Sequence, residues 1–405
     1  MIQLANLKLE LESELKDILE YWMTYSIDER FGGFYGSIGN DNIVDNDADR
    51  SLVLNARILW TFSSASLFTN EERHLQIAAR AYDYIVNFFF DHRYGGYFWA
   101  VDKHGVPTDT KKQVYGLAFC CYAFSEYYRA SGNHESLAHA QACFGFIEQH
   151  ASDQERSGYF EAFSREWTPV ADMRLSAKDA NEKKSANTHL HVLEAYTSLY
   201  RSWPDESLYH AIRRLLDDFS NYIVDKRSGH LQLFFDENWE VKGTTISYGH
   251  DIEASWLLVE AASVIEDEKL INTARCLGLQ LAEAACAGLD QDGGLWYESV
   301  NDQFVRQKHW WPQAEAMVGF FNAWQLSGEM KYLDHCLRSW QFIKENIRDK
   351  ENGEWFWGVG SNGEVMAGYD KAGFWKCPYH NSRACIEIAG RIKGILQRNE
   401  RKNMP

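Results

Sequence analysis

The chain of 405 residues predicts an all-α fold, an (α/α)6 barrel in which six helical hairpins and short β-hairpin turns form a single domain over residues 1–405. Two observations lead to this prediction. A glycine-containing turn recurs six times, and the segments between these turns have the apolar periodicity of helices. A superhelical solenoid is the structural alternative, but six units with unlike ends favour a closed ring.

The repeated turn places glycine before aromatic or apolar residues and a polar turn. Its copies are separated by 63, 63, 71, 64 and 60 residues, so each interval has room for two helices and a connection. Glycine suits the turn because it enters positive φ at little cost. The first glycines of the copies are Gly32, Gly95, Gly158, Gly229, Gly293 and Gly353.

Apolar residues recur at helical spacing most clearly over residues 114–130, 186–199, 253–265 and 315–326. The chain has only six prolines, and none of them interrupts these segments. In a closed ring, one helix of each hairpin packs around a central cleft. We therefore expect functional side chains at the N-terminal ends of the inner helices and in the glycine turns.

Composition narrows the class of protein. The formal net charge of −17 argues against a nucleic-acid partner or an anionic membrane. No apolar run is long enough to span a bilayer, and the N-terminus lacks the features of a signal peptide. The eight cysteines include no CxxC pair, which favours a reducing compartment. These features predict a cytoplasmic protein.

Arg57 lies among Leu54, Ile58, Leu59 and Trp60, which is an unusual place for an unpaired guanidinium. Such an arginine either forms a structural ion pair or presents its fork of donors to sugar hydroxyls or an oxyanion. His191 and His189 are two residues apart and do not share a helix face. Without an HExxH or CxxC pattern, we expect no metal there and take His191 as the inward-facing donor.

Three further groups stand at predicted helix entries. His250 and Glu253 are three residues apart, with Trp256 on the same face, so Glu253 is expected to hold the imidazole. Trp310 and Trp311 precede Pro312 as an aromatic platform, and Glu315 follows within the first turn. His380 enters the last helix, beside Trp375, Tyr379 and Arg383.

These residue types suit proton transfer near neutral pH. Histidine acts as both acid and base in this range, so two imidazoles can move a proton α to an aldehyde without a metal or nicotinamide. We find no GxGxxG or P-loop motif. A glycoside hydrolase, which needs two carboxylates, stays open, as does a non-catalytic carbohydrate-binding protein.

Five segments resemble the N-acylglucosamine 2-epimerase superfamily, and within it the cellobiose 2-epimerase branch. They are NARILWTFS, KSANTHLHVLEAYT, SYGHDIEASWLL, KHWWPQAEAMVGF and KCPYHNSRACIEI, and they extend over nearly the whole chain. The resemblance implies a cofactor-independent sugar 2-epimerase that opens the reducing-end ring and passes through a cis-enediolate. Its expected substrate is a β-1,4-linked disaccharide such as cellobiose. A mannose 2-epimerase or an aldose–ketose isomerase is the alternative.

The same resemblance assigns roles to individual residues. His250 and His380 correspond to the general acid/base pair, His191 to a further catalytic histidine, and Arg57 to the group that holds the oxyanion. The expected oligomeric state is a monomer or weak homodimer, and loops such as residues 172–184 are expected to decide whether a second sugar fits. The expected sugar-contacting or positioning residues are Tyr115, Asn187, Glu253, Trp256, Trp310, Trp311, Glu315 and Trp375.

Overall fold

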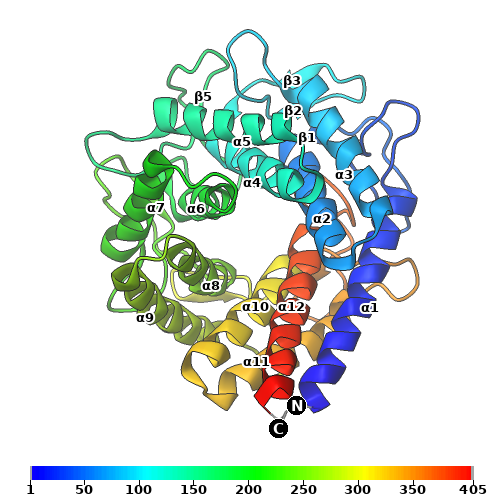
Figure 1. The fold of residues 1–405 in the computed structure, drawn as a ribbon, viewed down its shortest axis with the longest axis vertical. Coiled ribbons are helices and arrows are strands. Elements are labelled where there is room, and N and C mark those ends of the chain that lie inside the picture. The colour runs from blue at the N-terminus through cyan, green and yellow to red at the C-terminus, as the bar shows by residue number, and fades with distance from the viewer. Residues whose placement is uncertain (1, 403–405) are drawn as a thin grey trace.

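The computed structural model describes residues 2–402 and confirms the (α/α)6 barrel (Figure 1). Each inner helix packs on the next, and α12 closes the ring by packing on α2, while α1 packs outside α12. The inner helices are α2 (Leu52–Thr69), α4 (Val114–Ser131), α6 (Ala186–Tyr200), α8 (Tyr248–Val264), α10 (Trp310–Ser327) and α12 (Tyr379–Lys402). The outer helices are α1 (Ile2–Tyr25), α3 (Glu72–Tyr84), α5 (His134–Phe146), α7 (Glu206–Asp218), α9 (Glu268–Ala285) and α11 (Met330–Phe342).

The inner helices are apolar nearly all round because they lie between the barrel interior and the outer ring. Every residue of α2 from Leu52 to Ala65 is buried. The apolar stretches over 253–265 and 315–326 belong to helices that begin five residues earlier, at Tyr248 and Trp310, so the helix expected to begin at Pro312 already includes the two tryptophans before it. Polar residues interrupt the apolar pattern at these two ends, which is why the periodicity missed them.

Four outer helices continue into one π-helical turn, and α9 continues into a 3-10 turn. These segments lead the chain back toward the glycine turns. They are η1 (Ile85–Phe89), η2 (Ile147–Ala151), η3 (Phe219–Ile223), η4 (Cys286–Gly288) and η5 (Ile343–Ile347).

The predicted glycine turns are also confirmed. The first glycine of all six copies has a positive φ, between +73° and +91°. Each of the last five glycine turns is followed by a short strand. This strand pairs antiparallel with another short strand that stands just before an inner helix, as where Phe234 pairs with Ser185. The strand orders are β1-β2-β3, β4-β5, β6-β7, β8-β9-β10 and β11-β12. The strands are β1 (Arg50–Ser51), β2 (Ala100–Val101), β3 (Pro107–Asp109), β4 (Lys112–Gln113), β5 (Ala162–Phe163), β6 (Lys184–Ser185), β7 (Phe234–Phe235), β8 (Ile246–Ser247), β9 (Glu298–Val300), β10 (Gln303–Val305), β11 (Lys308–His309) and β12 (Gly358–Val359).

Buried ion pairs fasten this end of the barrel. Lys184, two residues before α6, places Nζ 2.8 Å from Oδ2 of Asp153 in the preceding turn, and the same carboxylate accepts backbone N–H groups of that turn. Because the arrangement recurs, the starts of several inner helices are held rigidly to their turns. The corresponding pairs are Arg50–Asp28, Lys112–Asp91 and Lys308–Asp290.

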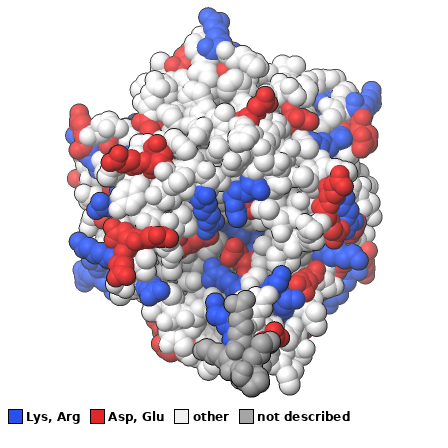
Figure 2. Space-filling model, in the orientation of Figure 1, with Lys and Arg blue, Asp and Glu red and all other residues white. Residues whose placement is uncertain are grey.

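The surface seen down the barrel carries acidic and basic side chains together, and Lys and Arg edge a hollow near the middle of this face (Figure 2). The basic side chains are therefore interspersed with acidic ones on a chain of net charge −17. Among residues 2–402, no helix has both the length and the apolar character needed to cross a membrane.

Candidate active site

The N-terminal halves of the inner helices bring most of the predicted residues into one cluster. Arg57 on α2 donates from Nη2 to the hydroxyl of Tyr115 on α4, at 2.7 Å. The Tyr115 ring lies 5.0 Å from the ring of His191 on α6. On the other side, the Trp311 ring of α10 lies 4.8 Å from His250 of α8 and 5.8 Å from His380 of α12. Two imidazoles therefore lie beside the same indole.

His250 is half-buried, and its Nδ1 forms a 2.8 Å hydrogen bond with Oγ of Ser247. The expectation that Glu253 holds this imidazole is therefore wrong. Side chains in the first turn of a helix lean back toward its N-terminus, which brings His250 to Ser247. Desolvation, together with the nearby His191, lowers the pKa of His250 to about 3, so the ring is neutral at neutral pH.

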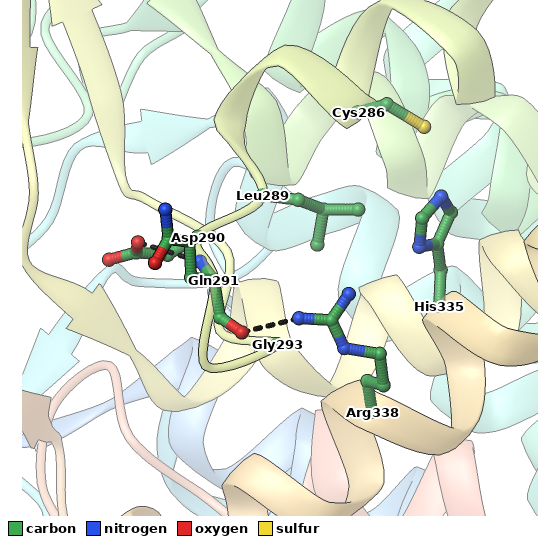
Figure 3. A pocket seen from close by; sticks show the side chains of 7 residues that line it. All are labelled: Cys286, Leu289, Asp290, Gln291, Gly293, His335 and Arg338. Carbon is green, nitrogen blue, oxygen red and sulfur yellow. Dashed lines mark hydrogen bonds between the residues drawn. The ribbon is translucent and has the colours of Figure 1, made fainter.

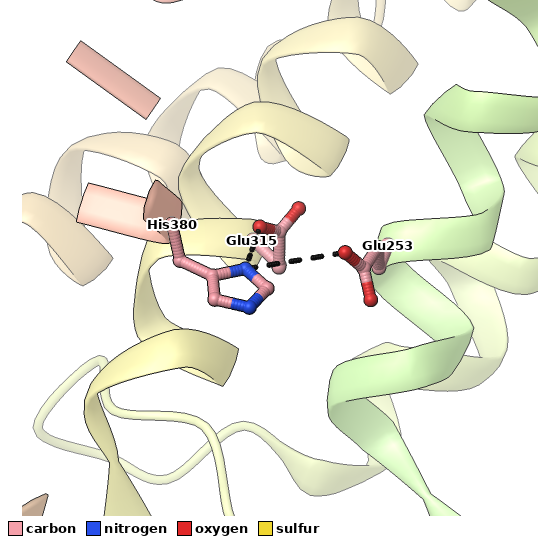
Figure 4. A group of neighbouring side chains, drawn as sticks. All are labelled: Glu253, Glu315 and His380. Carbon is pink, nitrogen blue, oxygen red and sulfur yellow. Dashed lines mark hydrogen bonds and ion pairs between the residues drawn. The ribbon is translucent and has the colours of Figure 1, made fainter. Parts of the chain in front are cut away.

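Glu253 instead belongs to the surroundings of His380. Nδ1 of His380 is hydrogen-bonded to Oε1 of Glu315 at 2.7 Å and lies 3.9 Å from Oε1 of Glu253. Figure 4 shows these three side chains converging from α8, α10 and α12. Burial lowers the pKa of His380 to about 3, although Glu315 opposes this shift. His380 is therefore also neutral at neutral pH.

Arg383, one turn after His380, joins the carboxylates of three helices. Its Nη2 donates to Oε1 of Glu253 at 2.7 Å and to Oε1 of Glu315 at 2.6 Å, and its Nη1 donates to Glu194. The guanidinium lies over the ring of Trp256, whose indole N–H donates to Oε2 of Glu315 at 3.1 Å. Glu253, Glu315 and Arg383 are each only 1% exposed, so this layer lies behind the histidines.

Arg383 and Glu194 were not among the predicted site residues, and neither was Tyr379, whose hydroxyl donates to Oε1 of Glu194 at 2.6 Å. A signal for two of them was present, because Arg383 and Glu194 each follow a candidate histidine by three residues and so share its helix face.

The two histidines of α6 have different surroundings. Nδ1 of His191 is hydrogen-bonded to Oε2 of Glu194 at 2.9 Å, and burial lowers the pKa of His191. His189 accepts the backbone N–H of Tyr159 at Nε2, at 2.9 Å, and so fastens a glycine turn. Asn187 lies half-buried in the first turn of the same helix.

Arg57 is buried without an ion-pair partner in the described part of the chain. It donates to the Tyr115 hydroxyl and, from Nη1 at 3.2 Å, to the carbonyl oxygen of Trp375, and it lies over the ring of Phe119. Its buried Nε has no hydrogen-bond partner. The interpretation of Arg57 as half of a structural ion pair therefore fails, and its positive charge faces the cluster uncompensated.

The four tryptophans of the predicted site differ in how far their side chains are exposed. Trp311 and Trp375 are half-buried, so part of each ring faces outward. Trp310 is buried against Trp357, with the ring centroids 4.5 Å apart, and Trp256 is buried beneath Arg383. Trp311 and Trp375 are therefore the indoles with surface free to stack on a sugar.

Glu253, Glu315 and His380 also have the geometry of a small cation site, because one ligand atom from each lies within 4.8 Å of the others. Arg383 already donates to one oxygen of each glutamate. A divalent ion would stand next to this guanidinium, and the two charges would repel each other. The absence of a metal requirement stays a prediction.

A separate pocket lies on the outer wall and contains none of the predicted residues (Figure 3). Its Arg338 donates to the carbonyl oxygen of Gln291, and its Asp290 pairs with Lys308 at 2.9 Å. Polar groups of this pocket are thus bonded to the protein itself. The lining residues are Cys286, Leu289, Asp290, Gln291, Gly293, His335 and Arg338.

Comparison with known proteins gives matches along nearly the whole chain. The family model described as N-acylglucosamine 2-epimerase (GlcNAc 2-epimerase) matches residues 33–384. A cellobiose 2-epimerase of Bacteroides fragilis is 46% identical over 387 residues, which are 95% of this chain and 99% of that protein. The structure of cellobiose 2-epimerase from Spirochaeta thermophila is 40% identical with a TM-score of 0.92, covering 98% of this chain and 99% of that one. A D-mannose isomerase of Marinomonas mediterranea is 24% identical over 396 residues, covering 93% of this chain and 96% of that protein.

Proposed function

Because the chain belongs to the N-acylglucosamine 2-epimerase family and is a carbohydrate isomerase, we propose that it interconverts glucose and mannose at the reducing end of cellobiose-type disaccharides. The observation that carries this proposal is that two imidazoles, those of His250 and His380, lie beside the same half-buried indole of Trp311, with ring centroids 4.8 and 5.8 Å from it. A neutral imidazole is the protonation state that can abstract a proton from carbon at neutral pH.

In the proposed reaction, the C2 proton leaves to one of these histidines and the other delivers a proton to the opposite face. The intermediate is a cis-enediolate, whose oxyanion is stabilised by the unpaired charge of Arg57 with Tyr115 beside it. His191 assists the intermediate, and Trp311 and Trp375 offer stacking faces.

Three residues expected to contact sugar or to position other groups are bonded to protein partners: Glu253, Glu315 and Trp256. Their proposed role is to orient His380. Asn187 and Trp310 keep the roles that the resemblance implies, as proposals.

A second sugar must fit outside this cluster. The loop predicted over residues 172–184, whose last residue lies in β6, reaches from the third repeat to the last one. Nζ of Lys178 lies 5.6 Å from the centre of the Tyr369 ring. Tyr369 in turn stacks on Trp357 at 4.8 Å. The stacked rings of Tyr369 and Trp357 offer an aromatic surface for a second sugar, which favours a disaccharide over a monosaccharide such as mannose. Reprotonation at C1 in place of C2 would give a ketose.

The buried carboxyl pair Glu253 and Glu315 does not suit a glycoside hydrolase. Such an enzyme needs two carboxylates on either side of the scissile bond, at a separation of about 5 Å or more. Glu253 and Glu315 share one nitrogen of Arg383 and are buried behind His380, so they cannot flank a sugar bond in this way.

We further propose a cytoplasmic location, because all eight cysteines are free and most are buried. A monomer or weak homodimer is the proposed oligomeric state.

Proton NMR in D2O with cellobiose, and separately with mannose, tests the proposal. Deuterium at C2 together with the epimer of cellobiose is the expected result. Faster turnover of mannose than of cellobiose would identify a monosaccharide as the substrate. Formation of a ketose would identify an aldose–ketose isomerase. Release of glucose from cellobiose without exchange at C2 would contradict the proposal.

A further inference from the structure

Three inner helices, α2, α6 and α8, each follow a serine at the N-cap position. The Ser51 hydroxyl accepts the backbone N–H of Leu54 at 2.9 Å, and the Ser185 hydroxyl accepts that of Thr188 at 3.1 Å. Such a bond pairs one of the free N–H groups of the first turn and stabilises the helix. In the described part of the chain, the hydroxyl of Ser247 at the start of α8 forms no bond of this kind. Ser247 therefore has the position of a cap without its bond.

The hydroxyl of Ser247 is bonded to a side chain. Its Oγ lies 2.8 Å from Nδ1 of His250, which follows Ser247 by three residues, the spacing at which Ser51 and Ser185 bond to the backbone. Ser247 is only 1% exposed, so water does not compete for this hydrogen bond. Resting on the proposed epimerase function, we infer that Ser247 is a positioning residue that holds Nδ1 of His250 and leaves Nε2 to take and return the C2 proton of the sugar.

Within residues 2–402, no second group holds this imidazole by a hydrogen bond. Trp311 packs beside it, with the ring centroids 4.8 Å apart. Gly249 permits this approach, because a Cβ at that position would lie 2.5 Å from the indole. The titratable groups that act on His250 from other helices are His191 on α6 and Glu315 on α10, and each is hydrogen-bonded to another residue. The serine hydroxyl is therefore the group that sets the rotation of the imidazole about its Cβ–Cγ bond.

The serine oxygen also selects the tautomer of the ring. When Nδ1–H of neutral His250 donates to Ser247, the lone pair lies on Nε2, which is then the nitrogen free to act as a base. In that role the C2–H bond breaks, the N–H bond at Nε2 forms, and the electron pair of the C–H bond goes into the enediolate. The imidazolium so formed still donates from Nδ1 to Ser247, and it returns a proton from Nε2 in the reverse step. His380 has a carboxylate, that of Glu315, at the corresponding place, 2.7 Å from its Nδ1.

Ser247→Ala tests this role of the serine. The change removes the partner of Nδ1 but no bond to the helix backbone, because the cap bond is missing in α8. We expect kcat for epimerisation to fall by about 10- to 10²-fold, the loss known for partners that orient metal-binding histidines. KM and the midpoint of urea denaturation should stay nearly unchanged. Ser247→Thr keeps the hydroxyl and should restore most of kcat, whereas full activity in Ser247→Ala would overturn the inference.

Ser185→Ala is the matched control. It removes the same hydroxyl from the same position of another inner helix, where this hydroxyl caps the backbone N–H of Thr188. The urea midpoint of this variant should fall, since loss of an N-cap destabilises a helix, and its kcat should fall less than that of Ser247→Ala. A loss of stability in Ser247→Ala as large as in Ser185→Ala, with no larger loss of kcat, would show that Ser247 is only a structural residue.

Exchange of the C2 hydrogen in D2O shows which histidine is affected. In Ser247→Ala, the sugar whose C2 proton His380 removes should still take up deuterium without inversion, whereas its epimer should lose exchange and epimerisation together. Glu315→Gln weakens the support of His380 and should reverse this assignment. Equal losses of exchange from both epimers in Ser247→Ala would overturn the inference. Absence of exchange in the wild-type protein with either sugar would instead remove the proposed function on which the inference rests.

Discussion

Arg57→Met removes a buried positive charge whose two hydrogen bonds go to neutral oxygens. Methionine fills much of the same volume with an apolar, flexible chain. If Arg57 stabilises the oxyanion, the change should lower kcat by about 10²- to 10³-fold, the usual loss for one such donor. The fold should respond much less.

The expected effect on stability follows from the partners of the guanidinium. Each lost hydrogen bond costs about 1–3 kcal/mol, because Tyr115 and Trp375 keep an acceptor without its donor. Against this, an unpaired charge no longer has to be desolvated, which is worth several kcal/mol. These contributions nearly cancel, so we expect the free energy of unfolding to change by less than about 2 kcal/mol.

Arg50→Met is the matched control. Arg50 is equally buried, lies seven residues earlier, and forms an ion pair with Asp28. Removing it strands a buried carboxylate and should cost about 3–5 kcal/mol. Urea denaturation and epimerisation kinetics on both variants measure the contrast. A loss of stability in Arg57→Met as large as that in Arg50→Met, or retention of full activity, would refute the reasoning.

Three other predictions concern the acid/base pair, the buried carboxyls and the turns. His380→Ala should lower epimer formation by about 10²- to 10⁴-fold without changing the circular dichroism spectrum, and exhaustive EDTA treatment should leave the wild-type rate unchanged; a loss that zinc restores would revive a metal site. Burial raises the pKa of Glu161 from 4.5 to about 8. Since this pKa is higher in the folded state, the carboxyl of Glu161 stabilises the fold fully below about pH 4.5, and this contribution is lost as pH rises through about 8. Glu161→Gln should therefore flatten the decline of Tm between pH 4.5 and 8. An unchanged slope of Tm against pH would contradict this role of Glu161. A Cβ at Gly158, where φ is +83°, would lie 2.5 Å from the ring of Trp239, whereas one at Gly132, where φ is +72°, would meet no atom within 4 Å. Gly158→Ala should thus cost the left-handed strain of about 1–2 kcal/mol plus about 1–3 kcal/mol of overpacking, Gly132→Ala only the strain, and equal losses in urea denaturation would contradict the packing argument.

Much of the fold could be predicted because its signals are local. The turn glycines are needed where the backbone enters positive φ, and the six predicted positions all have it. The helix over 114–130 was predicted to within one residue of α4, since its apolar pattern is unbroken. At α8 and α10 the pattern is broken by polar residues, so the clear apolar stretches begin five residues after the helices do, and the helix expected to begin at Pro312 begins at Trp310.

The candidate site was predictable as a set of side chains but not as a set of partners. Arg57, His250 and His380 stood out because polar groups interrupt apolar helices. The partner of Glu253 could not be predicted in this way, because that partner is Arg383, which is 130 residues away in the chain. The spacing of three residues suggested His250 as the partner of Glu253, but in the structure His250 is hydrogen-bonded to Ser247.

The sequence by itself therefore determined the number of repeats, the order of helices and the residues available for chemistry, since periodicity and turn preferences act over a few residues. Only the tertiary structure decided which carboxylate meets which base, and that the charge of Arg57 is left without an ion-pair partner in the described chain. Those contacts join helices of different repeats. They depend on how each helix is rotated about its axis and on the rotamer of each side chain, and the whole closed ring fixes both at once.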